Sequence, residues 1–304
     1  MTAFIGRRLL WMVVTLGVVF TISFFLMRFT PGGPYDSDRK LEPEIEAAIK
    51  REYLLDRPLA VQYGHKLGQL LAGDLGSSIK LDIRVGELIA QGLPVSMAMG
   101  LLALAIAFAV GMPAGVLAAV FRGGPTDAAL MGVATIGIAL PNFIIAGFAI
   151  LLFVFTIPLL PAAGWGSLEQ LVLPASCLGL PYAAYVARIA RTGMLDVLSQ
   201  DHIRTAKAKG LSPAAVVMKH AMPTAMLPVV SFLGPAVAGV LTGSPVVEQI
   251  FAIPGLGWHF VQSAINRDYP IAIGLVLLYT ALLYTMNLLV DISYSVLDPR
   301  VEWE

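Results

Sequence analysis

The sequence predicts an all-α integral membrane protein, and three observations lead to that prediction. Hydrophobic residues make up 57% of the 304 residues, charged residues make up only 13%, and the mean hydropathy is +0.79. The hydrophobic fraction and the mean hydropathy lie well above those of soluble domains, and the charged fraction lies well below. Six uncharged runs are long enough to cross the hydrocarbon core of a bilayer, which takes about 20 residues as a helix. They cover residues 9–27, 93–121, 128–157, 170–187, 221–247 and 269–290.

Two of the six runs could be read in another way. Run 9–27 is longer than the apolar core of a signal peptide and no A-x-A site follows it, so we expect a retained first helix. The third run ends in PLLPAAGWGS, residues 158–167, where two prolines and two glycines predict a turn. The single cysteine, Cys177, lies within an apolar run and is expected to pack in the core.

The positions of lysine and arginine are the third observation, because short basic segments stay on the cytoplasmic side. With the N-terminus inside, ten of these residues fall in inner segments, and the short outer loops hold only Arg267. The ten are Arg7, Arg8, Arg122, Arg188, Arg191, Arg204, Lys207, Lys209, Lys219 and Arg300. Both termini are therefore predicted to be cytoplasmic. The 20 basic and 20 acidic residues balance, which gives no overall signal for nucleic acid.

The outer segment after the first span is predicted to contain two helices rather than a flexible linker. In LEPEIEAAIKREYLL a helix should start at Pro43, after an acidic residue, and this helix places Ile45 and Ile49 on one face. PLAVQYGHKLGQLLAG places Leu59, Tyr63 and Leu67 in register and ends at a glycine, residue 73. These helices would form a small cap on the outer surface.

One cytoplasmic loop, residues 201–223, is strongly basic, and we call it the basic loop. DHIRTAKAKG begins with Asp201 and ends with lysines, which suits a short helix that stops at Gly210 in a left-handed conformation. In LSPAAVVMKHAMP, Ser212 is an N-cap candidate, Pro213 falls at the first helical position, and the helix should end before Pro223. A loop that served only to fix topology would need no capped helices, so these signals indicate a rigid docking surface.

The basic loop resembles the coupling loop of type I ABC importer permeases. That pattern is Glu-Ala-Ala, three residues, Gly, nine residues, a hydrophobic residue, any residue, Leu and Pro. The matching positions here are Arg204, Thr205, Ala206, Gly210, His220, Met222 and Pro223, so the leading glutamate is missing. The R-T-A form resembles the B-type permeases of oligopeptide, dipeptide and nickel importers, closest to the oligopeptide branch. FIGRRLLWMVVTLGVVFTISFFLMRFTPGGP, YLLDRPLAVQY, AGDLGSS, VVEQIFAIPGLGWHFVQSAINRDYP and LLVDISYSVLDPR extend the similarity over essentially the whole chain.

The resemblance implies a type I permease fold with six transmembrane helices and a defined layout. Residues 1–28 would hold the cytoplasmic tip and first helix, 29–92 the outer helical segment, 93–297 the transmembrane domain, and 298–304 a cytoplasmic tail. Within the transmembrane domain lie the coupling loop 191–222 and an outer loop 246–268. The residues implied to contact the ATPase are Arg204, Thr205, Ala206, Lys207, Gly210, Leu211, Ser212, Lys219, His220 and Pro223.

The implied function is that of a non-catalytic permease subunit in the cytoplasmic (inner) membrane of a prokaryote, forming half of an import pathway for peptides. Its partners would be a second homologous permease, two cytoplasmic ATPase subunits that bind ATP and Mg, and an extracytoplasmic solute-binding protein. The chain contains no G-x-x-x-x-G-K-[ST] motif, so energy would have to come from another polypeptide. We expect no bound cofactor and no nucleic acid. Oligopeptide, dipeptide and nickel chelate all remain open as substrates.

Candidate pathway and gate residues follow from the apolar spans and the outer loop. Pro141 should free a backbone carbonyl that the amide of Asn142 bonds, with a pathway role for Asn142 as the alternative. In VVEQIFAIPGLGWHF, the aromatic residues around Pro254 and Gly255 fit the outer interface. The resemblance implies that this stretch is a short outward hairpin near the gate. Glu248, with Arg267 and Asp268, flanks this stretch and is expected on a solvated rim, with contact to the binding protein as the alternative.

The alternatives to an importer permease are a passive channel or secondary transporter and an intramembrane serine hydrolase. A passive channel or secondary transporter would need ionisable residues near the middle of the bilayer or repeated broken helices, and we find neither in the sequence. A serine hydrolase built on Ser244 and His259 lacks a third residue to orient the histidine.

Overall fold

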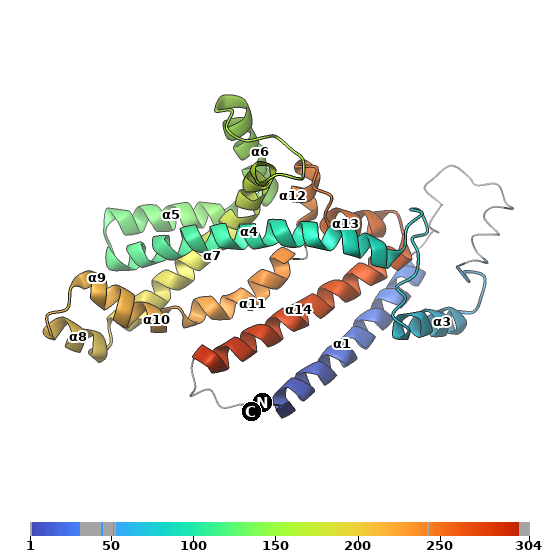
Figure 1. Ribbon diagram of the computed structural model, residues 1–304, viewed down its shortest axis with the longest axis horizontal. Helices are drawn as coiled ribbons and strands as arrows, with labels where there is room; N and C mark the ends of the chain where they lie inside the picture. The colour runs from blue at the N-terminus through green and yellow to red at the C-terminus, as the bar shows by residue number, and fades with distance from the viewer. Residues whose placement is uncertain (1, 31–43, 45–50, 52, 242, 298–304) are drawn as a thin grey trace. The chain divides into compact units, whose positions relative to one another are not determined.

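Helices form all the regular secondary structure of the described residues in this computed structural model (Figure 1). The structure describes residues 2–30, 44, 51, 53–241 and 243–297. Four helices are each long and apolar enough to cross a membrane, and two bent helix pairs raise the number to six if each pair is one span. The prediction of an all-α membrane protein is confirmed.

The chain divides into two compact units, which are residues 1–94 with 255–281 and residues 95–254 with 282–304. The first unit contains α1 (Thr2–Phe29), α3 (Leu59–Leu71) and α13 (Leu256–Ile265). The second contains the helices from α5 to α12. Two long helices, α4 (Val85–Val120) and α14 (Tyr269–Leu297), contribute to both units.

In the first unit, α3 packs on α1 through the face that the sequence predicts. Tyr63 and Leu67 contact Phe20 and Phe24 of α1, and the Tyr63 hydroxyl lies 2.9 Å from the hydroxyl oxygen of Thr21. Gly73 follows α3 with a φ of +80°, which is the expected glycine stop. Of the other expected outer helix, over 41–55, ten residues lie outside the described ones, and the described residues 53–55 form a turn.

In the second unit, the third run of the sequence forms two helices instead of one straight span. Helix α5 (Pro125–Ala139) is followed by α6 (Asn142–Ile150) and a π-helical turn, η1 (Leu151–Thr156). The direction changes by 108° between α5 and the α6–η1 pair, and Figure 1 shows α6 turning away from α5. Pro141 causes the break, because Leu140 before it is extended and the helix cannot continue.

The fourth and fifth spans also differ from their expected lengths. Helix α7 (Leu168–Leu198) extends well past the expected end at 187, and Ser167 caps its start in a capping box with Gln170. Helix α11 (Leu227–Leu241) ends before 247. The chain then turns at Gly243, which has a φ of +81°, and starts α12 (Pro245–Ile250) under the Ser244 cap.

Glycines allow α4 and α7 to approach each other at backbone distance. A Cβ atom at Gly111 or Gly115 of α4 would overlap the carbonyl oxygens of Ala183 and Ala187 of α7. One turn further along, a Cβ at Gly179 of α7 would overlap the Ala103 carbonyl. Small residues four apart on one face permit this packing between membrane helices.

Alanine substitution tests this glycine contact. We expect Gly111→Ala to lower the free energy of unfolding by about 1–3 kcal/mol, because the new methyl group meets backbone that has no room to move. Gly132→Ala is the matched control, since nothing lies within 4 Å of a Cβ there and alanine favours the helix. Thermal unfolding in detergent, followed by circular dichroism, measures both. Equal melting temperatures for the two variants would contradict the close approach of α4 and α7.

Candidate functional site

The basic loop begins with a short helix whose end is closed by a glycine turn. Helix α8 spans Asp201–Ala208, and Gly210 follows with a φ of +75°. The Leu211 N–H donates to the Ala206 carbonyl at 3.4 Å and the Gly210 N–H donates to the Lys207 carbonyl at 3.0 Å. These two bonds form a Schellman motif, so the predicted left-handed role of Gly210 is confirmed.

The second helix of the loop starts as predicted but does not end where predicted. The Ser212 hydroxyl accepts from the Ala215 N–H at 3.3 Å, and Pro213 occupies the first turn of α9 (Pro213–Ala215). The chain continues through a π-helical turn, η2 (Val216–Ala221), into α10 (Met222–Ala225). Pro223 therefore does not stop the helix. The wider π-helical turn before it shifts the pairing so that the Met222 N–H bonds the Val217 carbonyl.

A small apolar core fixes the basic loop to the ends of the long helices. Ile203 and Ala206 of α8 are buried against Val216 and Ala221 of η2. The same cluster includes Ala119 at the end of α4, Met194 and Val197 of α7, and Ala225 of α10. Ala206, which the resemblance places among the contact residues, therefore stabilises the loop from inside and does not lie on its surface.

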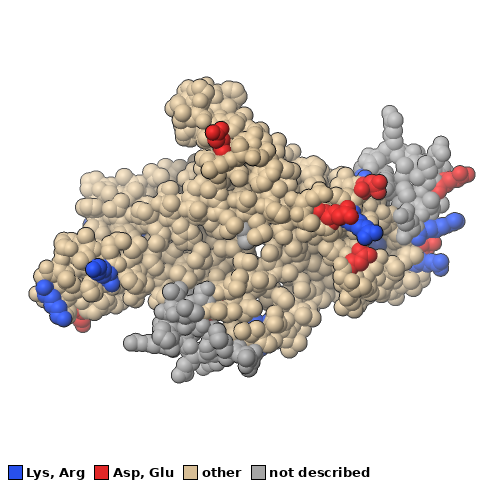
Figure 2. All heavy atoms as spheres, in the orientation of Figure 1, with Lys and Arg blue, Asp and Glu red and all other residues tan. Residues whose placement is uncertain are grey.

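The exposed face of the basic loop combines cations with apolar groups. Figure 2 shows lysine and arginine side chains over α8 and α9 on a surface that is otherwise largely uncharged. Met218, which is 58% exposed, adds a large apolar side chain that no motif of the sequence singles out. The other predicted contact residues are exposed too: Arg204, Thr205, Lys207, Gly210, Leu211, Ser212, Lys219, His220 and Pro223.

An ion pair that the sequence did not reveal ties α5 to α7 near the base of the basic loop. Nε of Arg191 lies 2.7 Å from Oδ1 of Asp127, and Nη2 donates to Oδ2 at 2.8 Å. Oδ2 also accepts from the Gly123 N–H at 2.9 Å. The carboxylate is buried, and this bidentate geometry satisfies both of its oxygens.

The predicted pathway residue Asn142 does not make the bond expected of it. Because α5 ends at Ala139, Pro141 lies at the N-cap of α6 and frees no carbonyl inside a helix. The Pro141 carbonyl instead accepts from the N–H groups of Ile144 and Ile145. Among the described residues, no hydrogen bond joins the Asn142 amide to a freed carbonyl, and the side chain is half-buried.

The outer loop is more deeply buried than the sequence predicts. Glu248 of α12 is completely buried, and one of its carboxylate oxygens accepts from the Ser96 hydroxyl of α4 at 2.8 Å. Phe251 is also fully buried, so its ring lies in the core and not at the interface. The expectation of a solvated rim is wrong for Glu248. Pro254 is exposed and Gly255 is buried, at the boundary between the two units.

Asp268 is likewise buried, which also contradicts the expected rim. Its carboxylate hydrogen-bonds the Ser78 hydroxyl and accepts from the Ile79 N–H at 3.2 Å. It therefore holds the turn over 78–81 against the start of α14. Arg267 beside it is half-buried and has a φ of +56°.

The family of the chain follows from comparison with known proteins. Residues 111–303 match the family model described as "Binding-protein-dependent transport system inner membrane component". The chain belongs to this family. It is thus the membrane-spanning permease subunit of an ABC-type importer, and its fold and apolar helices make it an integral membrane protein.

Full-length relatives of this permease carry names from peptide transport. The chain is 42% identical over 306 residues to the "Oligopeptide transport system permease protein OppB" of Haemophilus influenzae, covering 100% of both chains. The Escherichia coli protein of the same name is also 42% identical over 306 residues, with the same coverage. The "Dipeptide transport system permease protein DppB" of Bacillus subtilis is 42% identical, over 99% of this chain and 98% of the relative.

Solved structures support the fold of the permease. An inward-facing conformation of the MetNI methionine ABC transporter matches with a TM-score of 0.59 and 21% identity, over 69% of this chain and 96% of that chain. An amino acid ABC transporter matches with a TM-score of 0.52 and 18% identity, over 68% and 93% of the two chains. These likenesses confirm the predicted type I permease fold.

The ion pair at the base of the basic loop gives a stability test of this permease. Asp127→Asn should lower the melting temperature by clearly more than the control does, because it leaves the guanidinium of Arg191 without its carboxylate. Asp201→Asn is the control. It breaks an exposed pair with Arg204, in which the side chains are 93% and 76% exposed, and should cost well under about 1 kcal/mol. Thermal unfolding of both variants in detergent decides the matter, and similar losses would mean that the Asp127 pair contributes no more than a surface contact.

Proposed function

We propose that this permease forms half of a translocation pathway for peptides in an ATP-driven importer of a prokaryotic cytoplasmic membrane. In this proposal the second half is a homologous permease, two cytoplasmic ATPase subunits supply the energy, and an extracytoplasmic binding protein delivers the substrate. The 42% identity over full length to oligopeptide and dipeptide permeases supports the peptide substrate. The ten-to-one distribution of basic residues supports cytoplasmic termini and a cytoplasmic basic loop.

The observation that carries the mechanical part of the proposal is the rigid attachment of the basic loop. Its helices are capped at Gly210 and Ser212, and its buried residues pack on the ends of α4 and α7. A protein that binds the exposed face would therefore move the membrane helices with the loop as one body. Domain closure of an ATPase can drive the permease in this way, as a rigid-body shift.

The chemistry of the exposed face indicates what kind of groove would bind it. Arg204, Lys207 and Lys219 offer positive charge, while Met218 and Leu211 offer apolar area between the charges. A complementary groove would be apolar at its centre and acidic at its rim, as in other protein interfaces. The adaptable thioether side chain of Met218 suits the centre of such a contact.

Cysteine crosslinking tests the docking surface. Lys207→Cys and Met218→Cys should each crosslink to the ATPase subunit in the intact complex, because both positions are exposed on the basic loop. Asp56→Cys, which is exposed in the outer segment, is the control and should not crosslink. The native Cys177 is buried and does not interfere. Crosslinking at Asp56→Cys, or at neither loop position, would contradict the proposed topology and docking.

Substitution of Gly210 tests whether the shape of the loop matters for transport. Gly210→Val should reduce uptake of a labelled tripeptide at least several-fold while protein remains in the membrane at normal levels, because a β-branched residue at a φ of +75° is strained by about 1–2 kcal/mol or more. Gly210→Asn is the control, since asparagine tolerates this conformation and a Cβ there meets nothing within 4 Å. Normal uptake by the valine variant would show that the glycine turn plays no part in coupling.

A further inference from the structure

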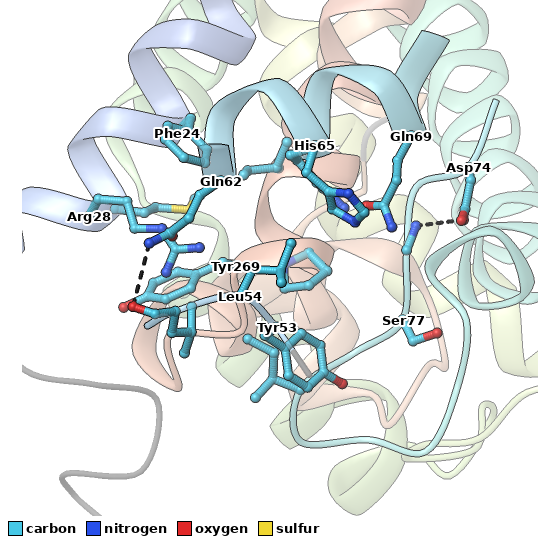
Figure 3. A pocket seen from close by; sticks show the side chains of 17 residues that line it. Phe24, Arg28, Tyr53, Leu54, Gln62, His65, Gln69, Asp74, Ser77 and Tyr269 are labelled. Atoms are coloured by element: carbon cyan, nitrogen blue, oxygen red, sulfur yellow. Dashed lines mark hydrogen bonds between the residues drawn. The ribbon is translucent and has the colours of Figure 1, made fainter. Parts of the chain in front are cut away.

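A cavity in the first unit combines cationic, amide and aromatic side chains that the transport mechanism does not use. Its volume is about 230 Å³. Figure 3 shows Phe24 and Arg28 from α1, Gln62, His65 and Gln69 from α3, and Tyr269 from the start of α14 around it. All of the lining residues belong to the unit made of residues 1–94 and 255–281.

Gln62 lines this cavity and carries a buried acceptor that is unsatisfied. The residue is only 7% exposed, and its Nε2 donates to the carbonyl of Arg57 at 2.7 Å and to that of Leu55 at 3.4 Å. These two bonds fix the orientation of the amide, so Oε1 is the free end. Among the described residues nothing donates to Oε1. A buried amide oxygen without a donor is costly, which favours a bound group that carries N–H or O–H.

Arg28 presents the complementary feature, a cation that no carboxylate of the described residues pairs with. Its guanidinium lies over the rings of Tyr269 and Phe24, with centroid distances of 4.9 and 5.5 Å. The side chain is half-buried, and within the described part of the chain no carboxylate pairs with it. Stacking on ring faces leaves the N–H groups in the guanidinium plane available to an anion.

Lys66 adds a second cation to the same cavity. Its Nζ donates to the Leu75 carbonyl at 2.8 Å, which uses one of the three N–H groups. Burial lowers the pKa of Lys66 below its usual value, and the carboxylate of Asp74 opposes this shift. Asp74 itself accepts from the Gly76 N–H at 2.8 Å. With two cations and one carboxylate, the cavity favours a negatively charged group.

The position of the cavity along the helices identifies the source of that group. Arg28 lies in the last turn of the apolar helix α1, and Tyr269 is the first residue of α14. Both therefore lie at the edge of the hydrocarbon region, where phospholipid phosphates are found and where aromatic residues gather. The same turns of α1 carry a shallow apolar hollow that suits an acyl chain, lined by Thr21, Ile22, Phe25, Leu26, Phe29 and Thr30.

We propose that this cavity binds the head group of a phospholipid, with the phosphate on Arg28 and Lys66 and a head-group N–H or O–H donor on Oε1 of Gln62. Phosphatidylethanolamine and phosphatidylglycerol both carry such a donor. Phosphatidylcholine does not, because its nitrogen is fully methylated. The site should therefore discriminate against phosphatidylcholine, since a site with a buried acceptor rejects a ligand that leaves the acceptor unpaired. Only the leaflet, the outer one, depends on the topology proposed above.

Native mass spectrometry of the full chain in its purified complex tests the proposal. Phosphatidylethanolamine should bind at least about tenfold more tightly than phosphatidylcholine with the same acyl chains, because one buried hydrogen bond distinguishes them. Arg28→Gln and Lys66→Gln should each weaken phosphatidylethanolamine binding about tenfold, through loss of a charge-assisted bond to phosphate. Gln62→Met should remove the preference for ethanolamine over choline. Arg84→Gln, an exposed cation of the same outer segment, is the matched control and should change nothing.

Several results would overturn the assignment. Equal retention of phosphatidylethanolamine by Arg28→Gln, Lys66→Gln and Arg84→Gln would show that lipid binds only around the helices. Displacement of the lipid by millimolar inorganic phosphate or by a free tripeptide would show that the cavity takes a soluble anion instead. Since Lys66 also bonds the chain at Leu75, melting temperatures accompany each titration, and Arg28→Lys, which keeps the charge, should retain part of the affinity. Lipid retention is measured without transport, so its failure would leave the proposed import function intact.

Discussion

The backbone contact between α4 and α7 is the constraint on which the rest of the second unit depends. In a bilayer the hydrophobic effect does not drive helices together, so they associate through close packing, and close packing needs small residues. Gly111, Gly115 and Gly179 remove the side chains that would otherwise separate the two helices. The glycine backbone of one helix then lies against the carbonyl oxygens of the other. At this short separation the two helices gain many dispersion contacts.

This contact explains how a loop outside the bilayer can be rigid relative to the spans. Helix α7 runs without interruption from Leu168 to Leu198, through two internal prolines, and its last turns form part of the core of the basic loop. A second close approach, between Gly193 and the Ala225 carbonyl, fixes α10 to α7 in the same way. The ion pair of Asp127 and Arg191 adds α5 to this assembly. Because these contacts are closely packed, a displacement of the basic loop is transmitted to α4, α5 and α7.

Local signals in the sequence predicted much of this structure. Caps and stops act over a few residues, so Gly73, Gly210 and Ser212 could be assigned to their turns before any contact was known. Tertiary partners could not be assigned. Glu248 and Asp268 look like exposed loop residues, because the Ser96 and Ser78 hydroxyls that bond them lie 152 and 190 residues away. The π-helical turns were also missed, since an extra residue per turn leaves the apolar pattern almost unchanged.

The buried carboxylates Asp127 and Glu248 differ from the polar groups that line the cavity of the first unit. In the second unit, Asp127 has two donors from Arg191 and one from a backbone N–H, and Glu248 is bonded by Ser96. Groups satisfied within the chain hold helices together and need nothing further. In the first unit, Gln62 and Arg28 line one cavity, and the described residues supply neither a donor for Oε1 of Gln62 nor a carboxylate paired with the guanidinium of Arg28. An unsatisfied acceptor and a cation that line the same cavity match a ligand that carries a donor next to an anion. At the edge of a bilayer, the phospholipid head group is the abundant molecule with that arrangement.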